Sequence, residues 1–516
     1  MSSLNTALLS LIVTFLPGLA AAQESVGIDQ RINTIFADYT GWYVSFIFAP
    51  LPGTTFSWIA LWLVVGAVVF TVYFGAIQLS GFVHSIRLVK GDYSDPNDAG
   101  EVSHFQALAT ALSGTVGLGN IAGVAVAVGI GGPGATFWMI IAGIFGMATK
   151  FTECTLGVKY RNEYPDGTVS GGPMYYITKG FKERGMAGGK ILAVLFCIFT
   201  ILGALGGGNM FQANQAHAQL SGVLGGYPGW ITGVILAVVV FAVIAGGLRS
   251  IARVTEKVVP FMGIFYVGVS LIILLMNFDQ IGWAFGRIFE GAFTGLGVLG
   301  GFTGALIQGF RRAAFSNEAG IGSAAIAHSA VRTKEPVTEG YVALLEPFID
   351  TVVICTMTAL VIVITGVLNV DPETGLYVWN AEAGRISTAG EVAGVELTSA
   401  AYAQAFSWFP ALLAIAVVLF AFSTMISWSY YGLKAWTYMF GEGAAKETIF
   451  KLIFCLFIVI GASANLGPVI DFSDAMLFSM AVVNVIALYL LMPIVKRELA
   501  SYVGRLKSGE IKRFKG

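Results

Sequence analysis

Charged residues are scarce in this chain. Only 11% of its 516 residues are Asp, Glu, Lys or Arg, whereas 56% are hydrophobic, and the mean hydropathy is +0.78. An average soluble domain carries about 25% charged residues, so this composition excludes a soluble enzyme and indicates a membrane protein. The 29 basic residues are balanced by 30 acidic ones, which leaves no basic excess for binding nucleic acid.

Cysteine and histidine are scarce as well, with four of each. The cysteines lie far apart inside apolar runs, which argues against a disulfide framework and against a zinc site. The histidines form no H-E-x-x-H pattern, and the chain contains neither a G-x-S-x-G motif nor a Walker loop. The sequence therefore predicts a protein that is not an enzyme and uses no organic cofactor.

Long apolar runs, in contrast, are abundant. Runs of about 18 or more residues are long enough to cross a bilayer, and they predict an all-α membrane protein with about eleven transmembrane helices. The predicted spans are 57–82, 104–130, 133–158, 190–221, 229–248, 258–278, 298–328, 340–368, 403–430, 449–466 and 475–495.

The lysines and arginines fall mainly into alternate loops between these spans. Only Arg31, Arg287 and Arg385 lie in the opposite set of loops. Because cytoplasmic loops carry the excess of Lys and Arg, we expect the first span to enter from outside. The same rule places the basic tail, 496–516, in the cytoplasm.

The N-terminus has the pattern of a signal peptide. A short apolar run from Leu8 to Leu19 is followed by three alanines, a typical cleavage site, so residues 1–22 are predicted to be removed. The run is preceded by no Lys or Arg, which leaves a retained N-terminal helix as the alternative. In either case, residues 23–56 are predicted to form an external segment.

Two of the spans contain glycine and polar residues near their middle. Residues 111–123 include four glycines together with Ser, Thr and Asn, and residues 315–323 repeat a G-x-G-polar core. Such clusters disfavour a continuous helix, although a small-residue seam for helix packing is the alternative for the first. Once the first span is set aside as an extra helix, these are the first and sixth of ten helices.

Because each half has five helices, an odd number, the second half crosses the membrane in the opposite orientation to the first. The predicted repeats are 104–278 and 298–495, preceded by the extra helix 57–82. Paired interrupted helices in two inverted repeats are the best sequence indication of a transporter's binding site at the middle of the membrane.

Three motifs carry a resemblance to a known family. Residues 115–120, Thr-Val-Gly-Leu-Gly-Asn, resemble the unwound first helix of LeuT-type sodium-coupled transporters. More specifically, residues 111–123, residues 315–323 with Ala327-His328, and residues 427–432 resemble the alanine or glycine:cation symporter family. The resemblance implies a LeuT-type 5+5 inverted repeat preceded by one extra helix, with broken first and sixth core helices.

The family resemblance also implies a function. It predicts a Na⁺-coupled symporter that imports alanine, glycine or both across a bacterial inner membrane by alternating access. Three alternatives stay open: a LeuT-type carrier for another small substrate, a carrier coupled to protons, and an uncoupled channel. The enantiomer, the ion stoichiometry and the oligomeric state are left undetermined.

The ends of broken helices suit a zwitterionic amino acid. Free backbone N–H groups can bind its carboxylate, and free carbonyls can bind Na⁺ or its ammonium group. The residues predicted to bind substrate in this way are Gly117, Leu118, Gly119, Asn120, Gly320, Ile321 and Gly322. Phe211, Gln212 and Trp428 are expected to line the pocket, and the ring of Trp428 would restrict it to small side chains. The alternative for Trp428 is an anchor at the membrane interface.

Two sodium sites follow from the same resemblance. The first would use Ser113, Val116, Phe420, Ser423 and Thr424. The alternative is that Ser423 and Thr424 bond to the backbone of their own helix. The second would use Thr115, Asn120, Glu318 and Asp350. Relatives place neutral oxygens at the last two positions, so these acidic groups could serve as charged ligands, proton carriers or arginine partners.

A few basic residues lie inside the predicted spans. Lys150 and Glu153 are three residues apart and could pair on one face of their helix. Because Lys150 lies close to the cytoplasmic end, it is instead expected to reach toward the membrane surface. Arg311 and Arg312 precede the second interruption and are predicted to form a gate with Glu318 or Glu346.

Overall fold

The structure is a computed structural model that describes residues 40–513, apart from residues 55, 96–97, 166, 295–300, 374–375, 383–384, 389 and 391. The predicted signal peptide and most of the predicted external segment therefore lie outside the described residues. A helix over 40–47 begins the described part of the chain.

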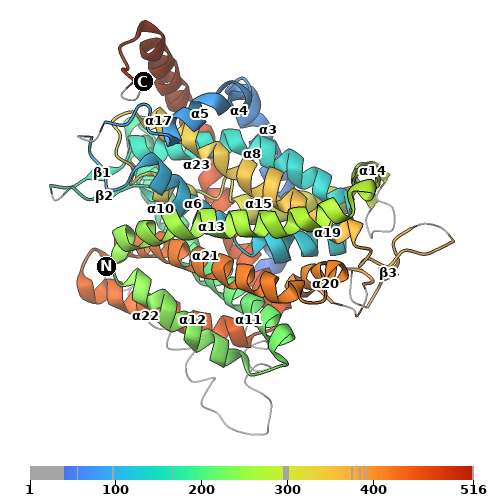
Figure 1. The fold of residues 1–516 in the computed structure, drawn as a ribbon. Coiled ribbons are helices and arrows are strands. Elements are labelled where there is room, and N and C mark those ends of the chain that lie inside the picture. Colours follow the sequence, from blue (N-terminus) through green and yellow to red (C-terminus); the bar gives the residue numbers. More distant parts are fainter. Residues whose placement is uncertain are drawn as a thin grey trace.

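The described chain is almost entirely helical, as the sequence predicts (Figure 1). Its first half contains α3 Trp58–Tyr73, α4 Ile77–Ser80, α5 Phe82–Val89, α6 His104–Thr115, η2 Gly119–Gly123, α7 Val124–Gly131, α8 Gly134–Lys159, α9 Pro173–Glu183, α10 Gly189–Leu205, η3 Gly206–Met210, α11 Phe211–Leu224, α12 Gly229–Ile244 and α13 Gly247–Met276.

The second half continues the pattern. It contains η4 Phe278–Gln280, α14 Ile281–Thr294, α15 Gly301–Asn317, α16 Ser323–His328, α17 Pro336–Ala343, α18 Leu345–Pro347, η5 Phe348–Cys355, α19 Thr356–Ile364, α20 Val395–Ala405, α21 Phe409–Phe440, α22 Ala444–Ser463 and α23 Leu466–Ser508. Two short antiparallel hairpins lie in loops, β1 Asn162–Glu163 with β2 Val169–Ser170, and β3 Trp379–Asn380 with β4 Arg385–Ile386.

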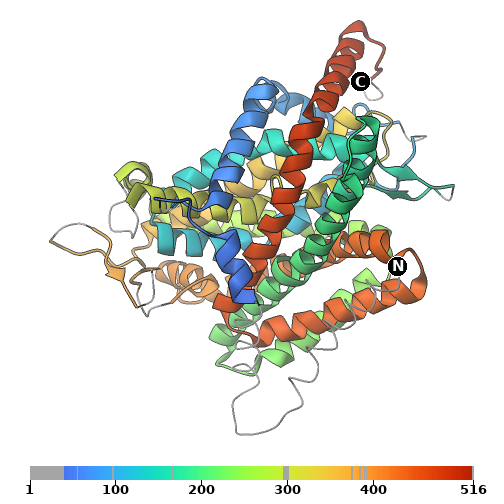
Figure 2. The same cartoon turned by 180° about the vertical axis from the view of Figure 1, so that it is seen from behind.

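The helices pack as one bundle with α8 in its interior, against α3, α15, α16 and α17. Helices α13 and α21 run side by side across the bundle, and α12 and α22 pack on each other at its edge (Figure 1). From behind, α23 crosses the molecule between α3 and α10 (Figure 2). The interrupted helices α6–α7 and α15–α16 thus lie among the most enclosed elements.

Among the described residues, six helices are long and apolar enough to cross a membrane, and the bent pair formed by α6 and Gly119–Gly131 makes seven if it is counted as one span. Several of the predicted spans are divided or short in the structure. Helix α3 leaves its axis at Phe74, since Gly75 and Ala76 have positive φ angles of 62° and 53°. Helix α12 has 16 residues, and α15 ends at the second interruption. The structure therefore establishes a multi-span membrane bundle.

Some boundaries differ from the predicted ones. Helix α23 has 43 residues and continues through much of the predicted basic tail, because residues 496–508 keep good helix formers such as Lys, Arg, Glu and Leu. Four described helices, α5, α9, α14 and α20, lie wholly or mostly in segments that the sequence pattern leaves between spans.

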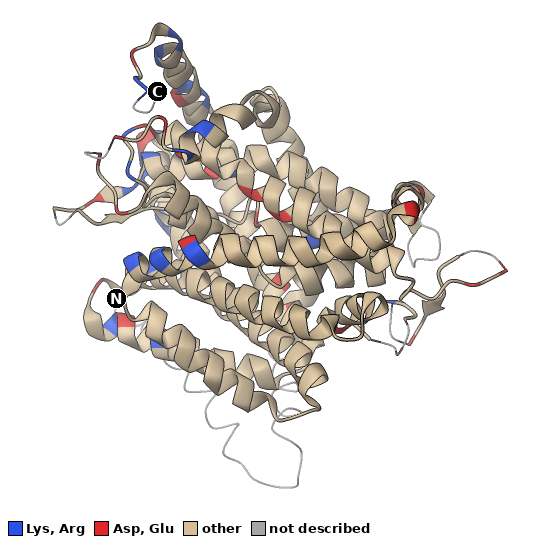
Figure 3. Ribbon diagram, viewed as in Figure 1, with Lys and Arg blue, Asp and Glu red and all other residues tan. Residues whose placement is uncertain are grey.

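Although some charged side chains are buried in the interior, most Lys and Arg residues lie at one side of the bundle (Figure 3). Figure 3 shows Lys and Arg gathered around β1, β2, the start of α13 and the C-terminal part of α23. The basic residues of the loops that were predicted to be cytoplasmic thus face the same side of the molecule.

Candidate functional site

The first interruption separates α6 from α7. Helix α6 begins with a capping box, in which Ser103 Oγ accepts from the Gln106 N–H at 3.2 Å. It ends at Thr115, and the next helical segment is inclined to it by 50°. The Gly117 N–H donates to Asn120 Oδ1 at 2.9 Å, so the side chain of Asn120 closes the turn between the two segments.

Gln212 reaches into this interruption from α11. Its Oε1 accepts from the Leu118 N–H at 3.0 Å, and its Nε2 donates to the Gly207 carbonyl at 2.9 Å. The N–H groups of Asn120 and Ile121 bond back to the carbonyls of Gly117 and Leu118. A substrate carboxylate that binds the Leu118 N–H would therefore have to replace Gln212 Oε1 there.

The second interruption separates α15 from α16. Glu318 has a φ of 58°, in the left-handed region that non-glycine residues seldom occupy, and Gly320 and Gly322 have φ values of 87° and 90°. The Gly320 carbonyl accepts from Asn484 Nδ2 at 2.9 Å. Gly320 and Gly322 thus both lie against α23 at Asn484.

The two interruptions meet at Asp350. Its carboxylate accepts from Asn120 Nδ2 at 2.6 Å, from Ser316 Oγ at 2.9 Å and from Thr351 Oγ1 at 2.7 Å, and it is fully buried. Gly119 lies so close to Ser316 that an added Cβ would stand 3.2 Å from its Cα. The buried carboxylate of Asp350 therefore accepts three hydrogen bonds and lies between the two broken helices.

The structure divides the predicted second sodium set. Asn120 and Asp350 come together, whereas Glu318 accepts from Trp428 Nε1 at 2.9 Å and from Ser323 Oγ. Thr115 Oγ1 bonds to the carbonyl of Ala111, one turn back in its own helix. Oxygen atoms of carboxylates, amides and hydroxyls are ligands that suit a hard cation, and the Asn120–Asp350 pair supplies them.

Three residues of the predicted first sodium set, Ser113, Phe420 and Ser423, are connected by hydrogen bonds where α6 meets α21. Ser113 Oγ donates to the Ser423 carbonyl at 2.6 Å, and Ser423 Oγ donates to the Phe420 carbonyl at 3.0 Å. Ser423 thus makes the backbone bond of the alternative interpretation. Thr424 Oγ1 is buried and has no hydrogen-bond partner among the described residues, and it lies next to Gly117. An unpartnered buried oxygen is a feature that a bound cation would satisfy.

The predicted pocket aromatics are buried beside the interruptions. Trp428 is 1% exposed and lies against Gly208, where an added Cβ would stand 2.2 Å from its ring. Its interpretation as an interfacial anchor is therefore wrong. Phe211 packs edge-on against Phe315, with ring centroids 5.0 Å apart.

The pairing of charged residues within the bundle differs from the sequence predictions, except that Lys150 Nζ lies 3.9 Å from Glu153 Oε1, the pair considered as the alternative. Lys150 is fully buried, and its Nζ lies 3.1 Å from Glu346 Oε2, so its predicted approach to the membrane surface is wrong. Arg311 and Arg312 both bond to Asp474 of α23, and their predicted gate with Glu318 or Glu346 is wrong as well. The partners are 162 to 196 residues away along the chain, and no local pattern connects them.

Two histidines that no sequence motif connects meet at one carboxylate in the structure. His104 and His328 contact the two carboxylate oxygens of Glu339, and His328 Nε2 lies 2.6 Å from Glu346 Oε1. The H-E-x-x-H motif joins histidines that are close in sequence, whereas His104 and His328 come from opposite halves of the chain.

Comparisons with known proteins agree on a family. A profile of the sodium:alanine symporter family matches residues 43–516. The sodium/alanine symporter AgcS of Methanococcus maripaludis is 40% identical over 433 residues, which cover 84% of this chain and 91% of AgcS. The probable sodium/glutamine symporter GlnT of Bacillus subtilis is 34% identical over 415 residues, which cover 79% of this chain and 80% of GlnT.

A solved structure supports the fold. MhsT in complex with L-phenylalanine superposes with a TM-score of 0.52 and 14% identity, covering 76% of this chain and 89% of MhsT. At that identity, the similarity concerns the fold alone. Together with the family profile, it identifies a membrane transporter and not an enzyme. The chain belongs to the sodium:alanine symporter family.

Proposed function

We propose that this protein is a Na⁺-coupled symporter that imports small neutral amino acids, alanine or glycine, by alternating access through a LeuT-type 5+5 inverted repeat with one preceding extra helix. Eleven transmembrane helices are part of this proposal. The observation that carries it is the junction at Asp350, where Asn120 from the first broken helix and Ser316 from the second bind one buried carboxylate. A cation and a zwitterion bound there would couple the two helices.

Na⁺ is the proposed coupling ion. Its first site comprises Ser113, Val116, Phe420, Ser423 and Thr424, and the unpartnered hydroxyl of Thr424 supports it. A second site centres on Asn120 and Asp350, with Thr115 and Glu318 as the further ligands inferred from sequence. One Na⁺ moving inward through a potential of 100 mV contributes about 2.3 kcal/mol to substrate accumulation.

The proposed substrate site lies between Gly117–Asn120, Gly320–Gly322 and the side chains of Phe211, Gln212 and Trp428. The close packing of Trp428 on Gly208 supports a small pocket. AgcS is named for alanine and GlnT for glutamine, so related chains differ in the substrate they are named for. The buried indole favours alanine or glycine here.

We place the protein in a bacterial inner membrane, with its N-terminal segment outside and its C-terminus in the cytoplasm. The clustering of Lys and Arg in alternate loops supports this orientation. Cleavage of residues 1–22 belongs to the same proposal.

Calorimetric titration of the purified protein tests the binding step. Glycine, alanine, leucine and glutamine are titrated in Na⁺ and in choline. We expect heat of binding for alanine or glycine in Na⁺, and at least about tenfold weaker binding in choline, because bound Na⁺ stabilises the substrate-binding arrangement. Equal binding in both salts would contradict Na⁺ coupling, and preference for glutamine would reassign the substrate.

Removal of the indole of Trp428 is expected to relax selectivity. In Trp428→Ala, the preference for alanine over leucine should fall by about tenfold or more, since each additional methylene admitted changes binding by about 1–3 kcal/mol. The control is Trp436→Ala, which removes a ring from the same helix where it packs on Phe440 and Phe450. Competition of each amino acid with labelled alanine uptake measures the preference, and unchanged preference in Trp428→Ala would remove this residue from the pocket.

A further inference from the structure

A cluster of ionisable side chains is buried beside the second interruption, apart from the proposed Na⁺ and substrate sites. Each member is at most 3% exposed. The members are His104 on α6, Lys150 and Glu153 on α8, His328 on α16, Glu339 on α17 and Glu346 on α18. The cluster therefore connects five interior segments of the bundle, and two of them, α6 and α16, belong to the broken helices.

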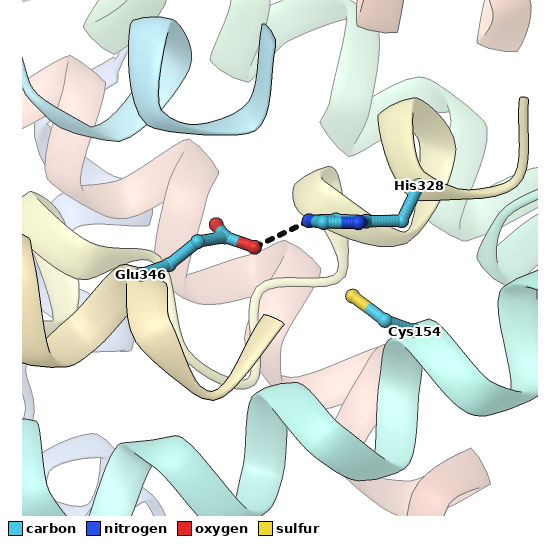
Figure 4. Close-up of side chains that lie close together, drawn as sticks. All are labelled: Cys154, His328 and Glu346. Atoms are coloured by element: carbon cyan, nitrogen blue, oxygen red, sulfur yellow. Dashed lines mark hydrogen bonds and ion pairs between the residues drawn. The ribbon is translucent and has the colours of Figure 1, made fainter. Parts of the chain in front are cut away.

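His328 lies between two carboxylates. Its Nδ1 contacts Glu339 Oε2, and its Nε2 lies 2.6 Å from Glu346 Oε1. Figure 4 shows the edge of the imidazole directed at Glu346, with Cys154 to one side. The other oxygen of Glu339 contacts His104 Nδ1.

The number of hydrogens in these contacts can be counted. A neutral imidazole has one N–H donor and one nitrogen that only accepts, and an ionised carboxylate only accepts. Both ring nitrogens of His328 face carboxylate oxygens at hydrogen-bonding distance, so a neutral ring with two ionised carboxylates would leave one pair of acceptors in contact. We propose that His328 is held as an imidazolium, so that the protein carries a resident proton between Glu339 and Glu346.

The charged groups around His328 are compatible with an imidazolium. Lys150 Nζ lies 3.1 Å from Glu346 Oε2, so the lysine and the imidazolium oppose two carboxylates. Glu153 Oε1 is 3.9 Å from Lys150 Nζ and adds a third acidic group. The other ionisable groups that interact with the cluster are Cys154 on α8, Tyr176 on α9 and Tyr431 on α21, together with Glu318 at the second interruption and Asp350 on η5.

A metal ion suits the cluster less well than a proton. The ligand atoms of Cys154, His328 and Glu346 lie within 4.8 Å of one another, a spacing that a metal could bridge. However, both ring nitrogens of His328 are engaged by carboxylates, and Glu346 also binds the Lys150 ammonium. A divalent cation would have to displace these bonds and stand beside an ammonium group in a buried site.

Glu339 joins the two broken helices through its two carboxylate oxygens. His104 is the first residue of α6, and its bond to Glu339 joins α6 to α17, while His328 joins α16 to the same carboxylate. Because every member is enclosed, the proton stays with the protein while Na⁺ and substrate cross. Retention of the proton during transport rests on the proposed function, whereas the protonation of His328 does not.

Nitrogen NMR of the full-length protein in lipid bilayers tests the protonation directly. The chain has four histidines, which are labelled with ¹⁵N in the wild type, His328→Gln and His84→Gln. At pH 8.5 we expect one histidine ring with both nitrogens protonated. This signal should be lost in His328→Gln. It should be retained in His84→Gln, because the His84 ring contacts Tyr502 and not the cluster. A wild-type spectrum with only neutral rings at that pH would overturn the proposal.

Glu339→Gln provides a second test if His328→Gln does not fold. The new amide can donate to a neutral His328 nitrogen, so the doubly protonated signal should disappear at pH 8.5. Its persistence would contradict the proposed bridge. The matched change Glu335→Gln alters the carboxylate that binds Arg505 and should leave the signal unchanged.

Residence of the proton is tested in vesicles that contain a pH-sensitive dye. During Na⁺-driven alanine uptake, we expect no acidification of the interior beyond that of protein-free vesicles. Acidification in proportion to alanine uptake would show a transported proton and overturn residence. Absence of any alanine uptake would contradict the proposed function, while the NMR spectrum would still decide the protonation of His328.

Discussion

Replacement of Lys150 by methionine is expected to lower the free energy of unfolding by about 3–5 kcal/mol, the cost of leaving a buried carboxylate without its partner. Lys150 and Glu346 are both fully buried, with their charged atoms 3.1 Å apart. Methionine preserves most of the volume of the lysine side chain but cannot donate to Glu346. Thermal unfolding of the purified variant, followed by circular dichroism in detergent, measures the loss as a lower midpoint.

The same helix offers a matched control. Lys159 and Glu498 form a pair with a distance of 2.6 Å, but both side chains are about one quarter exposed or more, at 25% and 30%. Lys159→Met is therefore expected to cost less than about 1 kcal/mol. If Lys150→Met and Lys159→Met unfolded at the same temperature, the description of a buried charged cluster would be wrong.

The substitution Gly117→Ala is expected to reduce alanine uptake by about tenfold or more. An added Cβ at Gly117 would stand 2.3 Å from Thr424 Oγ1 and 3.2 Å from Gln212 Oε1. Such overpacking costs about 1–3 kcal/mol, and about 1.4 kcal/mol corresponds to a tenfold change in an equilibrium. The methyl group would occupy the space between the predicted sodium ligand and the side chain that holds Leu118.

Gly123→Ala is the control for this prediction. It lies in η2, a few residues further on, and its added Cβ would come no closer than 3.9 Å to the Leu118 carbonyl. Uptake of labelled alanine into proteoliposomes, normalised to the amount of folded protein, compares the two variants. Equal uptake by both would contradict the importance of close contact at Gly117.

The sequence was informative where a local pattern has a local consequence. Clusters of glycine and polar residues interrupt helices for reasons of backbone entropy and unsatisfied hydrogen bonds, and the structure interrupts both segments there. The pocket position of Trp428 came from a family resemblance, and its burial is consistent with that position. Extended apolar runs likewise predicted membrane-spanning helices. The ends of the observed helices differ from the predicted ends where a turn, such as Gly75–Ala76, divides an apolar run.

Long-range pairing could not be read from the sequence. Lys150 is 196 residues from Glu346, and His104 is 235 residues from Glu339. Which of several acidic groups a buried base meets depends on how the two halves of the chain pack, and hydropathy does not encode that choice. Asp474 illustrates the point. It precedes the predicted last span by one residue, but in the structure it is buried within α23 as the partner of Arg311 and Arg312.

The junction at Asp350 links these observations to transport. Asn120, Ser316 and Asp350 bring the two broken helices into contact through side chains that also suit a cation. Binding of Na⁺ there would change how the two helices are held, which is the differential interaction that any ion-driven shift between conformations requires.

The most direct measurement is uptake of labelled alanine and glycine into proteoliposomes under an inward Na⁺ gradient. We predict accumulation of alanine or glycine above its external concentration, and its loss when external Na⁺ is replaced by K⁺ or choline. Accumulation that is unchanged after this replacement would contradict a Na⁺-coupled symporter.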